Sequence, residues 1–289
     1  MWYDNFDLTE YNGYRINARC ESAFLPKSKG DLLKFLNENA RDSFKILGSG
    51  HNVILQNQYY KSTLLILSEN YSDMVWDSHS DGINTCTSLS GTSLKSLSLE
   101  ALKFSASGLE YFYDIPSSLG GAVIMNAGTR DATIGDLIEW VGLYDYSQGK
   151  YRIVEKDWLE FRYRNSALQE AKDKIIVDVG LKLNSGNADS IERTMKNQKA
   201  LRWSKQPREL PNCGSVFKRP SGRYVGPMIE SLGLKGYCVG DACVSEKHAG
   251  FIVNKGSATG ANILKLIENI KAEVRQAYDV ELDVEQRIL

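Results

Sequence analysis

Two glycine-rich segments hold the residues of this chain best suited to bind an anionic ligand. The first, at 47–52, reads Leu-Gly-Ser-Gly-His-Asn and lies between two short apolar stretches. Closely spaced glycines let backbone N–H groups converge on an anion such as a pyrophosphate. The segment is not a GxGxxG dinucleotide fingerprint, because Val53 occupies the third glycine position and a strand is expected to follow. A purely structural turn is the alternative.

The second segment, at 115–128, contains Ile-Pro-Ser-Ser-Leu-Gly-Gly-Ala and, after a short apolar run, Asn-Ala-Gly. Adjacent glycines allow the backbone to approach a large planar or phosphorylated ligand closely. Glycine clusters also form tight turns without any ligand, so this segment alone does not decide between the two uses.

Two further segments contain side chains that could act on a substrate. At 161–166, Phe-Arg-Tyr-Arg-Asn-Ser, two arginines could hold a carboxylate or phosphate by forked hydrogen bonds; a surface strand with solvated arginines is the alternative. At 212–220, Ser215 follows a glycine, as a nucleophile often does. Gly-x-Ser-x-Gly is absent and no histidine is placed as its base, which disfavours hydrolysis by a Ser-His-Asp triad.

Composition indicates an ordinary globular protein. A length of 289 residues suggests about two domains, and 42% hydrophobic residues exclude disorder. The formal net charge of −1 gives no electrostatic reason to expect nucleic acid or an anionic membrane as partner. No apolar run is long enough to cross a bilayer, and the first residues lack a secretion signal. We therefore expect a cytoplasmic protein.

Cysteine and histidine usage argues against disulfide and metal frameworks. The five cysteines form no CxxC pair, and an odd number fits no closed set of disulfides. We therefore expect reduced, mostly buried thiols. The three histidines lie far apart and show no zinc-ligand spacing, so no metal site is expected.

Hydrophobic periodicity predicts helices and strands mixed along the chain, as in α/β or α+β architecture. Ser28 and Thr259 are the expected N-caps of the first and last helices. The expected helices are 28–41, 94–101 and 259–278, and the expected strands are 44–47, 53–55, 123–125, 175–183 and 280–285. In the last strand Glu285 lies on the polar face, toward solvent or a cleft. A proline-containing polar stretch after about residue 196 predicts a domain junction.

Taken together and in this order, the segments resemble the FAD-dependent UDP-N-acetylenolpyruvoylglucosamine reductases (MurB family) of bacterial cell-wall synthesis. The resemblance covers about residues 14–289. It is strongest at 214–218, Gly-Ser-Val-Phe-Lys, and from 236 to 254, which ends in Val-Ser-Glu-Lys-His-Ala-Gly-Phe-Ile-Val-Asn. The length resembles the shorter type of the family, which lacks an extra substrate-covering loop.

The resemblance implies an α+β fold, with a two-domain FAD-binding unit of the vanillyl-alcohol-oxidase/PCMH type and a C-terminal α/β substrate domain. The predicted ranges are 1–72 and 73–196 for the FAD-binding subdomains and 197–289 for the substrate domain, whose last strand could return to the FAD unit. The residues expected to line non-covalent FAD are Gly48, Ser49, Gly50, His51, Asn52, Ser118, Gly120, Gly121, Ala122, Asn126, Ala127 and Gly128.

The resemblance also implies a reaction in two halves. NADPH reduces FAD, and the reduced flavin N5 then delivers hydride to the enolpyruvyl double bond of UDP-N-acetylglucosamine enolpyruvate, giving UDP-N-acetylmuramate. Ser215 matches the family's proton donor, and Arg164 and Glu285 match the pair that stabilises the charged intermediate. An arginine suits this role because it stays charged at any working pH.

The nucleotide-sugar substrate implied by the resemblance carries a diphosphate and a uracil. The residues expected to contact it are Tyr163, Arg202, Lys205, Lys218 and Tyr224. For the basic residues a solvated surface position is the alternative, and for the tyrosines it is buried packing. We expect NADPH as co-substrate and a monomer or weak oligomer.

Several positions depart from the family pattern, all in the flavin half. Asp114 and Ser117 stand where glycine is usual, His51 replaces a usual serine, and 17–19 replace a usual glycine pair. Three alternatives therefore stay open: a paralogue acting on a related nucleotide sugar, another flavin oxidoreductase of the same FAD fold such as an alcohol or sugar oxidase, and a nucleotide-sugar binding protein without flavin.

Overall fold

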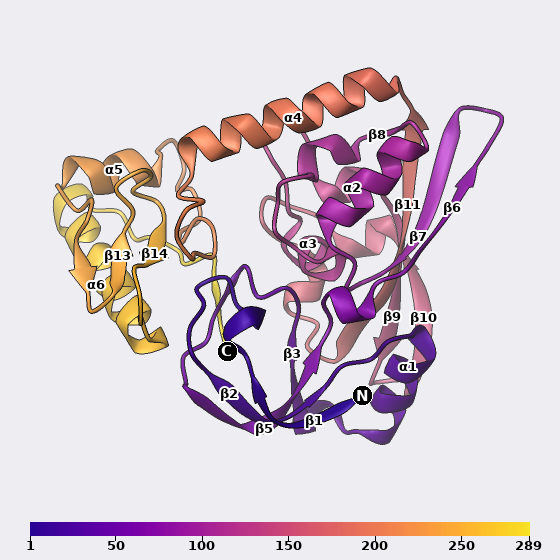
Figure 1. Ribbon diagram of the computed structural model, residues 1–289, viewed down its shortest axis with the longest axis horizontal. Coiled ribbons are helices and arrows are strands. Elements are labelled where there is room, and N and C mark those ends of the chain that lie inside the picture. The colour runs from indigo at the N-terminus through magenta and orange to yellow at the C-terminus, as the bar shows by residue number, and fades with distance from the viewer. The chain divides into compact units, whose positions relative to one another are not determined.

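The computed structural model describes the whole chain, residues 1–289 (Figure 1). The chain forms two compact units, each built from several stretches of sequence. Unit 1 comprises Met1–Tyr3, Ala23–Ser49 and Ser62–Leu201, and unit 2 comprises Asp4–Ser22, Gly50–Lys61 and Arg202–Leu289. The glycine-rich segment at 47–52 therefore contributes residues to both units. The three domain ranges expected from the sequence stay a prediction.

Unit 1 contains a six-stranded antiparallel sheet in the order β10-β9-β11-β7-β6, with β8 paired to β11. The strand predicted at 175–183 is confirmed as the centre of this sheet, and its residues from 175 to 181 are all buried. The strands are β6 (Met74–Ser78), β7 (Ile83–Leu89), β8 (Ala106–Ser107), β9 (Ile138–Asp145), β10 (Lys150–Glu155) and β11 (Lys174–Ser185).

Helices α2 (Leu94–Lys103) and α3 (Leu119–Met125) share one apolar core with this sheet. Each begins after a serine whose hydroxyl accepts a backbone N–H, Ser93 from Ser96 and Ser118 from Gly121. The helix at 94–101 is confirmed, but the strand at 123–125 is wrong, because these residues form the last turn of α3. A short apolar run does not distinguish a buried strand from a buried helix, and here the serine cap starts a helix.

Helix α1 (Lys29–Glu38) belongs to a second core of unit 1, with Leu32, Phe35 and Leu36 buried against aromatic and aliphatic side chains. Its predicted N-cap is confirmed, since Ser28 Oγ accepts the N–H of Asp31 at 3.1 Å. The predicted strand β3 (Phe44–Leu47) pairs in parallel with β5 (Tyr59–Ile66). Both belong to a four-stranded sheet in the order β1-β2-β5-β3, with β1 at Trp2–Asp7 and β2 at Arg19–Phe24.

Unit 2 contains an antiparallel sheet of β12 (Cys238–Val239), β13 (Ala242–Val244) and β14 (Ile252–Asn254). Helices α5 (Val225–Ser231) and α6 (Gly260–Tyr278) accompany it (Figure 1). The predicted cap and stripe of α6 are confirmed: Thr259 forms a capping box with Asn262, and the stripe positions Ile263, Ile267, Ile270 and Val274 are buried. A two-stranded parallel pair joins β4 (Val53–Ile54) to β15 (Arg287–Ile288).

The strand predicted at 280–285 is largely wrong. Only Arg287–Ile288 forms a strand, and the preceding residues make a single bridge, between Val284 and Phe217. The segment has too few paired neighbours for a regular strand, although its alternation persists: Leu282 is buried, whereas Glu281 and Asp283 are exposed. Glu285 is half-buried rather than fully turned to solvent.

The expectation that all cysteines are reduced is also wrong. Cys238 and Cys243 form a disulfide, because the tight turn between β12 and β13 places them directly opposite each other. Spacing rules based on CxxC do not detect such a cross-strand pair. The three remaining cysteines, Cys20, Cys86 and Cys213, are buried free thiols.

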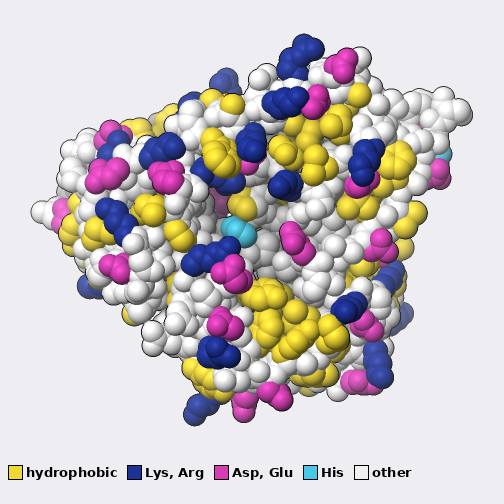
Figure 2. All heavy atoms as spheres, viewed as in Figure 1, with side chains coloured by type: hydrophobic (Ala, Val, Ile, Leu, Met, Phe, Trp, Pro, Cys, Tyr) yellow, Lys and Arg dark blue, Asp and Glu magenta, His cyan; other side chains and the backbone are white.

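The remaining helix of several turns is α4 (Ala188–Lys205). Single turns of 3-10 helix lie at Thr9–Tyr11, Arg41–Ser43, Glu69–Tyr71, Leu109–Phe112, Ile134–Asp136, Lys156–Leu159 and Ala167–Gln169. None of the helices combines the length and apolar character that a membrane crossing requires. Basic and acidic side chains are interspersed over the face drawn in Figure 2, as the near-zero net charge leads one to expect.

Candidate active site

In unit 1, the first part of the glycine-rich segment meets the start of α3. Gly48 and Ser49 follow β3, and Ser49 Oγ accepts the backbone N–H of Ser118 at 3.2 Å. A Cβ on Gly48 would lie only 2.9 Å from Ser118 Oγ, so a side chain here would displace the Ser118 hydroxyl. The structure thus brings together two segments that the sequence predicted separately as ligand-binding.

The glycine pair in α3 serves packing within the protein. The N–H groups of Leu119 and Gly120 donate to the carbonyls of Thr92 and Ser90, at 2.8 and 2.7 Å. A Cβ on Gly120 would lie 3.0 Å from that of Ser90, and Ala122 is fully buried. The first turn of α3 is therefore held against 90–92, and those two N–H groups are not available to an anion.

The end of α3 positions the arginine predicted to be catalytic. Asn126 adopts a left-handed conformation with φ +42° and ends the helix. Its side chain accepts the N–H of Gly135 at 3.1 Å and donates to the carbonyl of Arg162 at 3.0 Å. Asn126 thereby ties α3 to a tight turn at 162–165, while Ala127 donates its N–H back to Ala122.

Arg164 lies at the tip of that turn in a left-handed conformation, φ +53°. Its guanidinium donates to the carbonyl of Gly128 at 3.2 Å, and its own carbonyl accepts from Gln169 Nε2 at 2.8 Å. Such a backbone is unfavourable for a residue with a side chain and persists where neighbours impose it, often at functional sites. The adjacent Tyr163 is 66% exposed and accessible to a ligand.

In unit 2, Ser215 lies on a short extended segment held between two others. The N–H of Val216 donates to the carbonyl of Gly250 at 3.0 Å, and the carbonyl of Val216 accepts the N–H of Glu285 at 2.8 Å. Val216 and Phe217 are buried and Ser215 is exposed. The structure therefore places Ser215 at the surface of unit 2, on a segment bonded directly to the backbone of Glu285.

The second part of the glycine-rich segment lies beside the same residues. The carbonyl of Gly50 accepts the N–H of Gly13 at 3.0 Å and the thiol of Cys213 at 3.4 Å. Asn52 Nδ2 donates to the carbonyl of Glu285 at 3.3 Å. Residues 50–52, predicted to bind the cofactor, are thus linked within one unit to the segments that carry Ser215 and Glu285.

Two titratable groups near this segment stay neutral at physiological pH. Burial raises the pKa of the Cys213 thiol to about 12, so it is not a nucleophile. Burial lowers the pKa of His248, and its Nδ1 accepts the N–H of Gly250 at 3.1 Å. The Cys213 thiol and the His248 ring, which lie near the Ser215 segment, are therefore both uncharged.

The predicted substrate residues are dispersed. Arg202 and Lys205 occupy the last turn of α4. Lys218 follows the Ser215 segment, and its backbone N–H donates to the carbonyl of Asp283 at 2.8 Å. Tyr224 is 62% exposed at the start of α5, and the Arg219 guanidinium lies 3.7 Å from the centre of its ring. The sequence analysis missed Arg219, because only the turn at 219–224 brings the two side chains together.

Comparisons with known proteins agree with this architecture. Residues 206–289 match the family model of the UDP-N-acetylenolpyruvoylglucosamine reductase C-terminal domain. A UDP-N-acetylenolpyruvoylglucosamine reductase of Clostridium botulinum (strain Eklund 17B / Type B) is 37% identical over 288 residues, covering 99% of this chain and 92% of its own. One from Francisella tularensis (strain SCHU S4 / Schu 4) is 35% identical over 283 residues, covering 98% of both chains.

A solved structure extends the similarity to the fold. The UDP-N-acetylenolpyruvylglucosamine reductase (MurB) of Thermus caldophilus superposes with a TM-score of 0.79 at 27% identity, over 100% of this chain and 98% of its own. The fold is thus that of a UDP-N-acetylenolpyruvylglucosamine reductase, and the predicted α+β class is confirmed. The chain belongs to the UDP-N-acetylenolpyruvoylglucosamine reductase family.

The fold of this family implies FAD, and the residues present fit its anionic pyrophosphate. The N–H groups of Gly48 and Ser49 have no acceptor within the protein. Neither 47–53 nor 115–128 contains an acidic side chain that would repel a phosphate. Gly48 and Ser49 are therefore the best-supported of the predicted cofactor residues, whereas Gly120 and Ala122 face the protein interior.

Proposed function

We propose that this protein reduces UDP-N-acetylglucosamine enolpyruvate to UDP-N-acetylmuramate, using FAD and NADPH, in the synthesis of peptidoglycan precursors. The observation that carries the proposal is the 37% identity, over 99% of the chain, to a protein named for this reduction. The geometry of unit 2 supports it, since Ser215 and Glu285 lie on hydrogen-bonded segments although 70 residues of chain (285 − 215) separate them.

The chemistry that FAD supplies when bound is transfer of a hydride from NADPH to the terminal carbon of the enolpyruvyl double bond. The backbone N–H groups of Gly48 and Ser49 would hold its pyrophosphate, and the family resemblance assigns His51 and Asn52 to the same cofactor. Residues 117–121 and 126–128, whose backbone is hydrogen-bonded through Gly120 to Ser90 and through Asn126 to Arg162, would contact the same cofactor.

Ser215 donates a proton to the carbon next to the substrate carboxylate. The hydride completes the methyl carbon and the double bond becomes a single bond. The serine proton completes the neighbouring carbon, and the serine regains a proton from water, so that charge and atoms balance. Serine is a weak acid in water, and this transfer requires that its hydroxyl be held within hydrogen-bond reach of that carbon. The exposed position of Ser215 leaves its hydroxyl accessible to substrate.

Arg164 and Glu285 stabilise the charge that develops on the substrate carboxylate as hydride arrives. A planar guanidinium binds two carboxylate oxygens at once and stays charged, which suits a dianionic enolate. Glu285 contributes as a hydrogen-bonding partner at the same carboxyl. Arg202, Lys205 and Lys218 meet the diphosphate of the substrate, and Tyr163 and Tyr224 present exposed rings to its sugar and base.

The reaction takes place in the cytoplasm, where NADPH and the nucleotide sugar are made, and the protein acts as a monomer or weak oligomer. No nucleic acid or membrane partner is needed. Sedimentation at micromolar concentration tests the oligomeric state, and a fixed dimer would overturn that part.

An anaerobic spectrophotometric titration tests the activity. Purified protein with bound flavin is bleached by NADPH, and UDP-N-acetylglucosamine enolpyruvate is then added without oxygen. Rapid return of flavin absorbance is the expected result and demonstrates both halves of the reaction. Bleaching without return would contradict the proposed substrate and favour another acceptor, and a protein that binds no FAD would exclude the flavoenzyme.

A further inference from the structure

A buried hydrogen bond joins two residues 272 positions apart behind the Ser215 segment. The hydroxyl of Tyr14, which is 0% exposed, donates to Oε1 of Gln286 at 2.9 Å, and Gln286 is 4% exposed. Burial raises the pKa of Tyr14 well above its ordinary value, so the hydroxyl stays a donor at every working pH. The bond fixes which end of the Gln286 amide faces Tyr14.

With its oxygen facing Tyr14, the Gln286 amide turns its nitrogen toward the backbone that precedes and includes Ser215. Nε2 donates to the carbonyl of Cys213 at 3.2 Å and lies within 3.4 and 3.5 Å of the carbonyls of Gly214 and Ser215. Three successive carbonyls therefore converge on a single amide group. Without it, the carbonyl of the buried Cys213 would lose this donor, and a buried acceptor left without a donor is costly.

The glycine of the turn that Gln286 supports is held by hydrogen bonds and not by side-chain packing. Gly214 adopts φ +77° and a Cβ there would meet no atom within 4 Å, so the turn is not fixed by packing. On its other side Asn212 Oδ1 accepts the N–H of Gly214 at 3.0 Å. Two amide side chains, one on each side of the turn, therefore help to fix the backbone that precedes Ser215.

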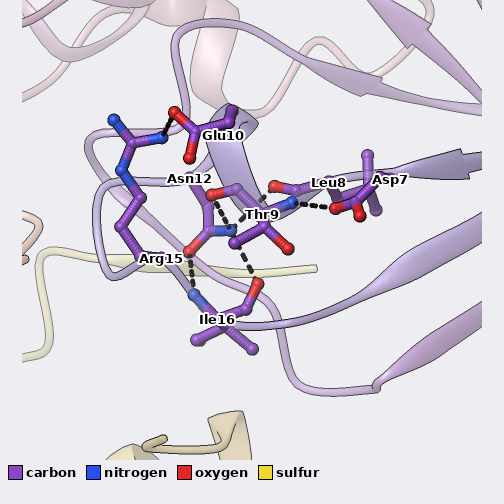
Figure 3. Close-up of polar contacts among 7 residues, drawn as sticks. All are labelled: Asp7, Leu8, Thr9, Glu10, Asn12, Arg15 and Ile16. Atoms are coloured by element: carbon purple, nitrogen blue, oxygen red, sulfur yellow. Dashed lines mark hydrogen bonds and ion pairs between the residues drawn. The ribbon is translucent and has the colours of Figure 1, made fainter. Parts of the chain in front are cut away.

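Tyr14 is itself positioned by a loop that a buried asparagine organises. Asn12 Nδ2 donates to the carbonyls of Leu8 and Ile16 at 2.9 and 3.1 Å, and its Oδ1 accepts the N–H of Ile16 at 2.9 Å (Figure 3). Asn254 Nδ2 donates to the carbonyl of Tyr14 at 2.8 Å. These hydrogen bonds hold loop 8–16 and position the Tyr14 hydroxyl.

We propose that Gln286, oriented by Tyr14, is a positioning residue for catalysis: its amide fixes the backbone at 213–215 and so aims the Ser215 hydroxyl at the substrate. Because Gln286 directly follows Glu285, the same amide also fixes the backbone of that residue. The proposal rests on the proposed function, in which Ser215 is the proton donor. Neither Tyr14 nor Gln286 touches substrate or exchanges a proton.

The test separates the two half-reactions in the FAD-loaded enzyme by anaerobic stopped-flow. Gln286→Met keeps the length of the side chain and removes the donor. A displacement of about 1 Å at a reacting group costs about 10²-fold, so we expect reoxidation by substrate to slow about 10–100-fold. Flavin reduction by NADPH should stay within about twofold, because no proton from Ser215 enters that step.

Tyr14→Phe removes only the hydroxyl and is expected to slow reoxidation about 3–10-fold. Its matched control is Tyr71→Phe, since Tyr71 is equally buried and its hydroxyl has no hydrogen-bond partner. If Tyr14 acts through Gln286, the double variant should be no slower than Gln286→Met alone. The pH dependence of reoxidation should keep its wild-type midpoint, because neither residue titrates in the reaction.

Equal slowing of both half-reactions, or wild-type reoxidation in both variants, overturns the positioning role. Multiplying effects in the double variant overturn the dependence of Tyr14 on Gln286. If Gln286→Met does not fold, Tyr14→Phe decides the matter alone, because it leaves all carbonyl partners in place. Failure of the proposed function would look different from failure of the positioning role. In that case the flavin of the wild-type protein would stay bleached when substrate is added.

Discussion

The turns that carry Arg164 and Ser215 are built in different ways. The turn at 162–165 is held by residues at moderate sequence separation: Arg164 bonds Gly128, 36 positions away, and Gln169, which bonds Arg164, also bonds Ile124, 45 positions away. The segment at 213–217 is held by residues far away in the sequence. Cys213 donates a hydrogen bond to Gly50, 163 positions away, and Tyr14 donates one to Gln286, 272 positions away. One turn is held by bonds that span up to 45 positions and the other by bonds that span up to 272, nearly the whole chain.

This difference predicts which of the two turns is more sensitive to substitution. Several separate bonds tie 162–169 to 124–128, so the loss of one leaves the others in place. The Ser215 segment depends on buried polar groups that cannot turn to water when a partner is removed. Substitutions around Ser215 should therefore have the larger effects on rate and stability.

The largest effect is expected for Ser215→Ala. Loss of a positioned general acid typically costs about 10²–10⁴-fold, so reoxidation of the flavin by substrate should slow by that factor while reduction by NADPH is retained. Stopped-flow absorbance under anaerobic conditions measures both. Ser257→Ala, at another exposed serine of unit 2, is the control and should leave both rates unchanged.

Gly50→Ala tests the distant contacts of unit 2 through stability. Gly50 has φ +69° and a Cβ there would overlap the carbonyl oxygen of Tyr11, so strain and displacement together should cost about 2–4 kcal/mol in the free energy of unfolding. Urea denaturation measures the loss.

Gly149→Ala is the matched control in unit 1. Gly149 has φ +61° but nothing within 4 Å of a built Cβ, so only the backbone cost of about 1 kcal/mol applies. Equal losses in the two variants would contradict the close approach of Tyr11 to Gly50.

Arg164→Lys tests the turn at 162–165. An ammonium keeps the charge but not the planar fork, so reoxidation should slow about tenfold, less than the roughly 10²–10³ of removing a donor outright. Arg162→Lys, at the exposed arginine of the same turn, should be neutral. If Arg164→Lys turns over normally, Arg164 does not contact the substrate carboxylate.

The effect that vanishes at neutral pH concerns buried thiols, one in each unit. Burial raises the pKa of Cys86 and of Cys213 to about 12, whereas an unfolded thiol ionises near 8.5. The stabilisation is therefore complete below about pH 8.5 and is lost as pH rises toward 12. Each thiol should lower the free energy of unfolding by up to about 1.4 kcal/mol per pH unit in this window.

Cys213→Ala and Cys86→Ala should each remove one such contribution from the alkaline slope measured by urea denaturation. Cys213→Ala should also lose pH-independent stability, since its thiol donates to the carbonyls of Gly50 and Val53, each at 3.4 Å. An unchanged slope in both variants would show that these thiols are not what destabilises the protein at high pH.

Local chemistry was enough to predict many elements of this protein. Ser28 and Thr259 cap helices where the sequence places them, and the stripe from Ile263 to Val274 faces a core, because capping and amphipathic periodicity act within a few residues. The order of the motifs was enough to recognise the family. The roles of Ser215, Arg164 and Glu285 follow from that recognition and remain predictions.

Only the tertiary structure determined the features that depend on residues far apart in the sequence. Residues 123–125 are helical because Ser118 caps a turn packed on Ser90, and Cys238 meets Cys243 because two strands pair. The environment of Ser215 is the clearest case. Tyr14 and Gln286 carry no recognisable motif, and they meet only because burial of a hydroxyl and an amide requires each to find a partner, wherever in the chain that partner lies.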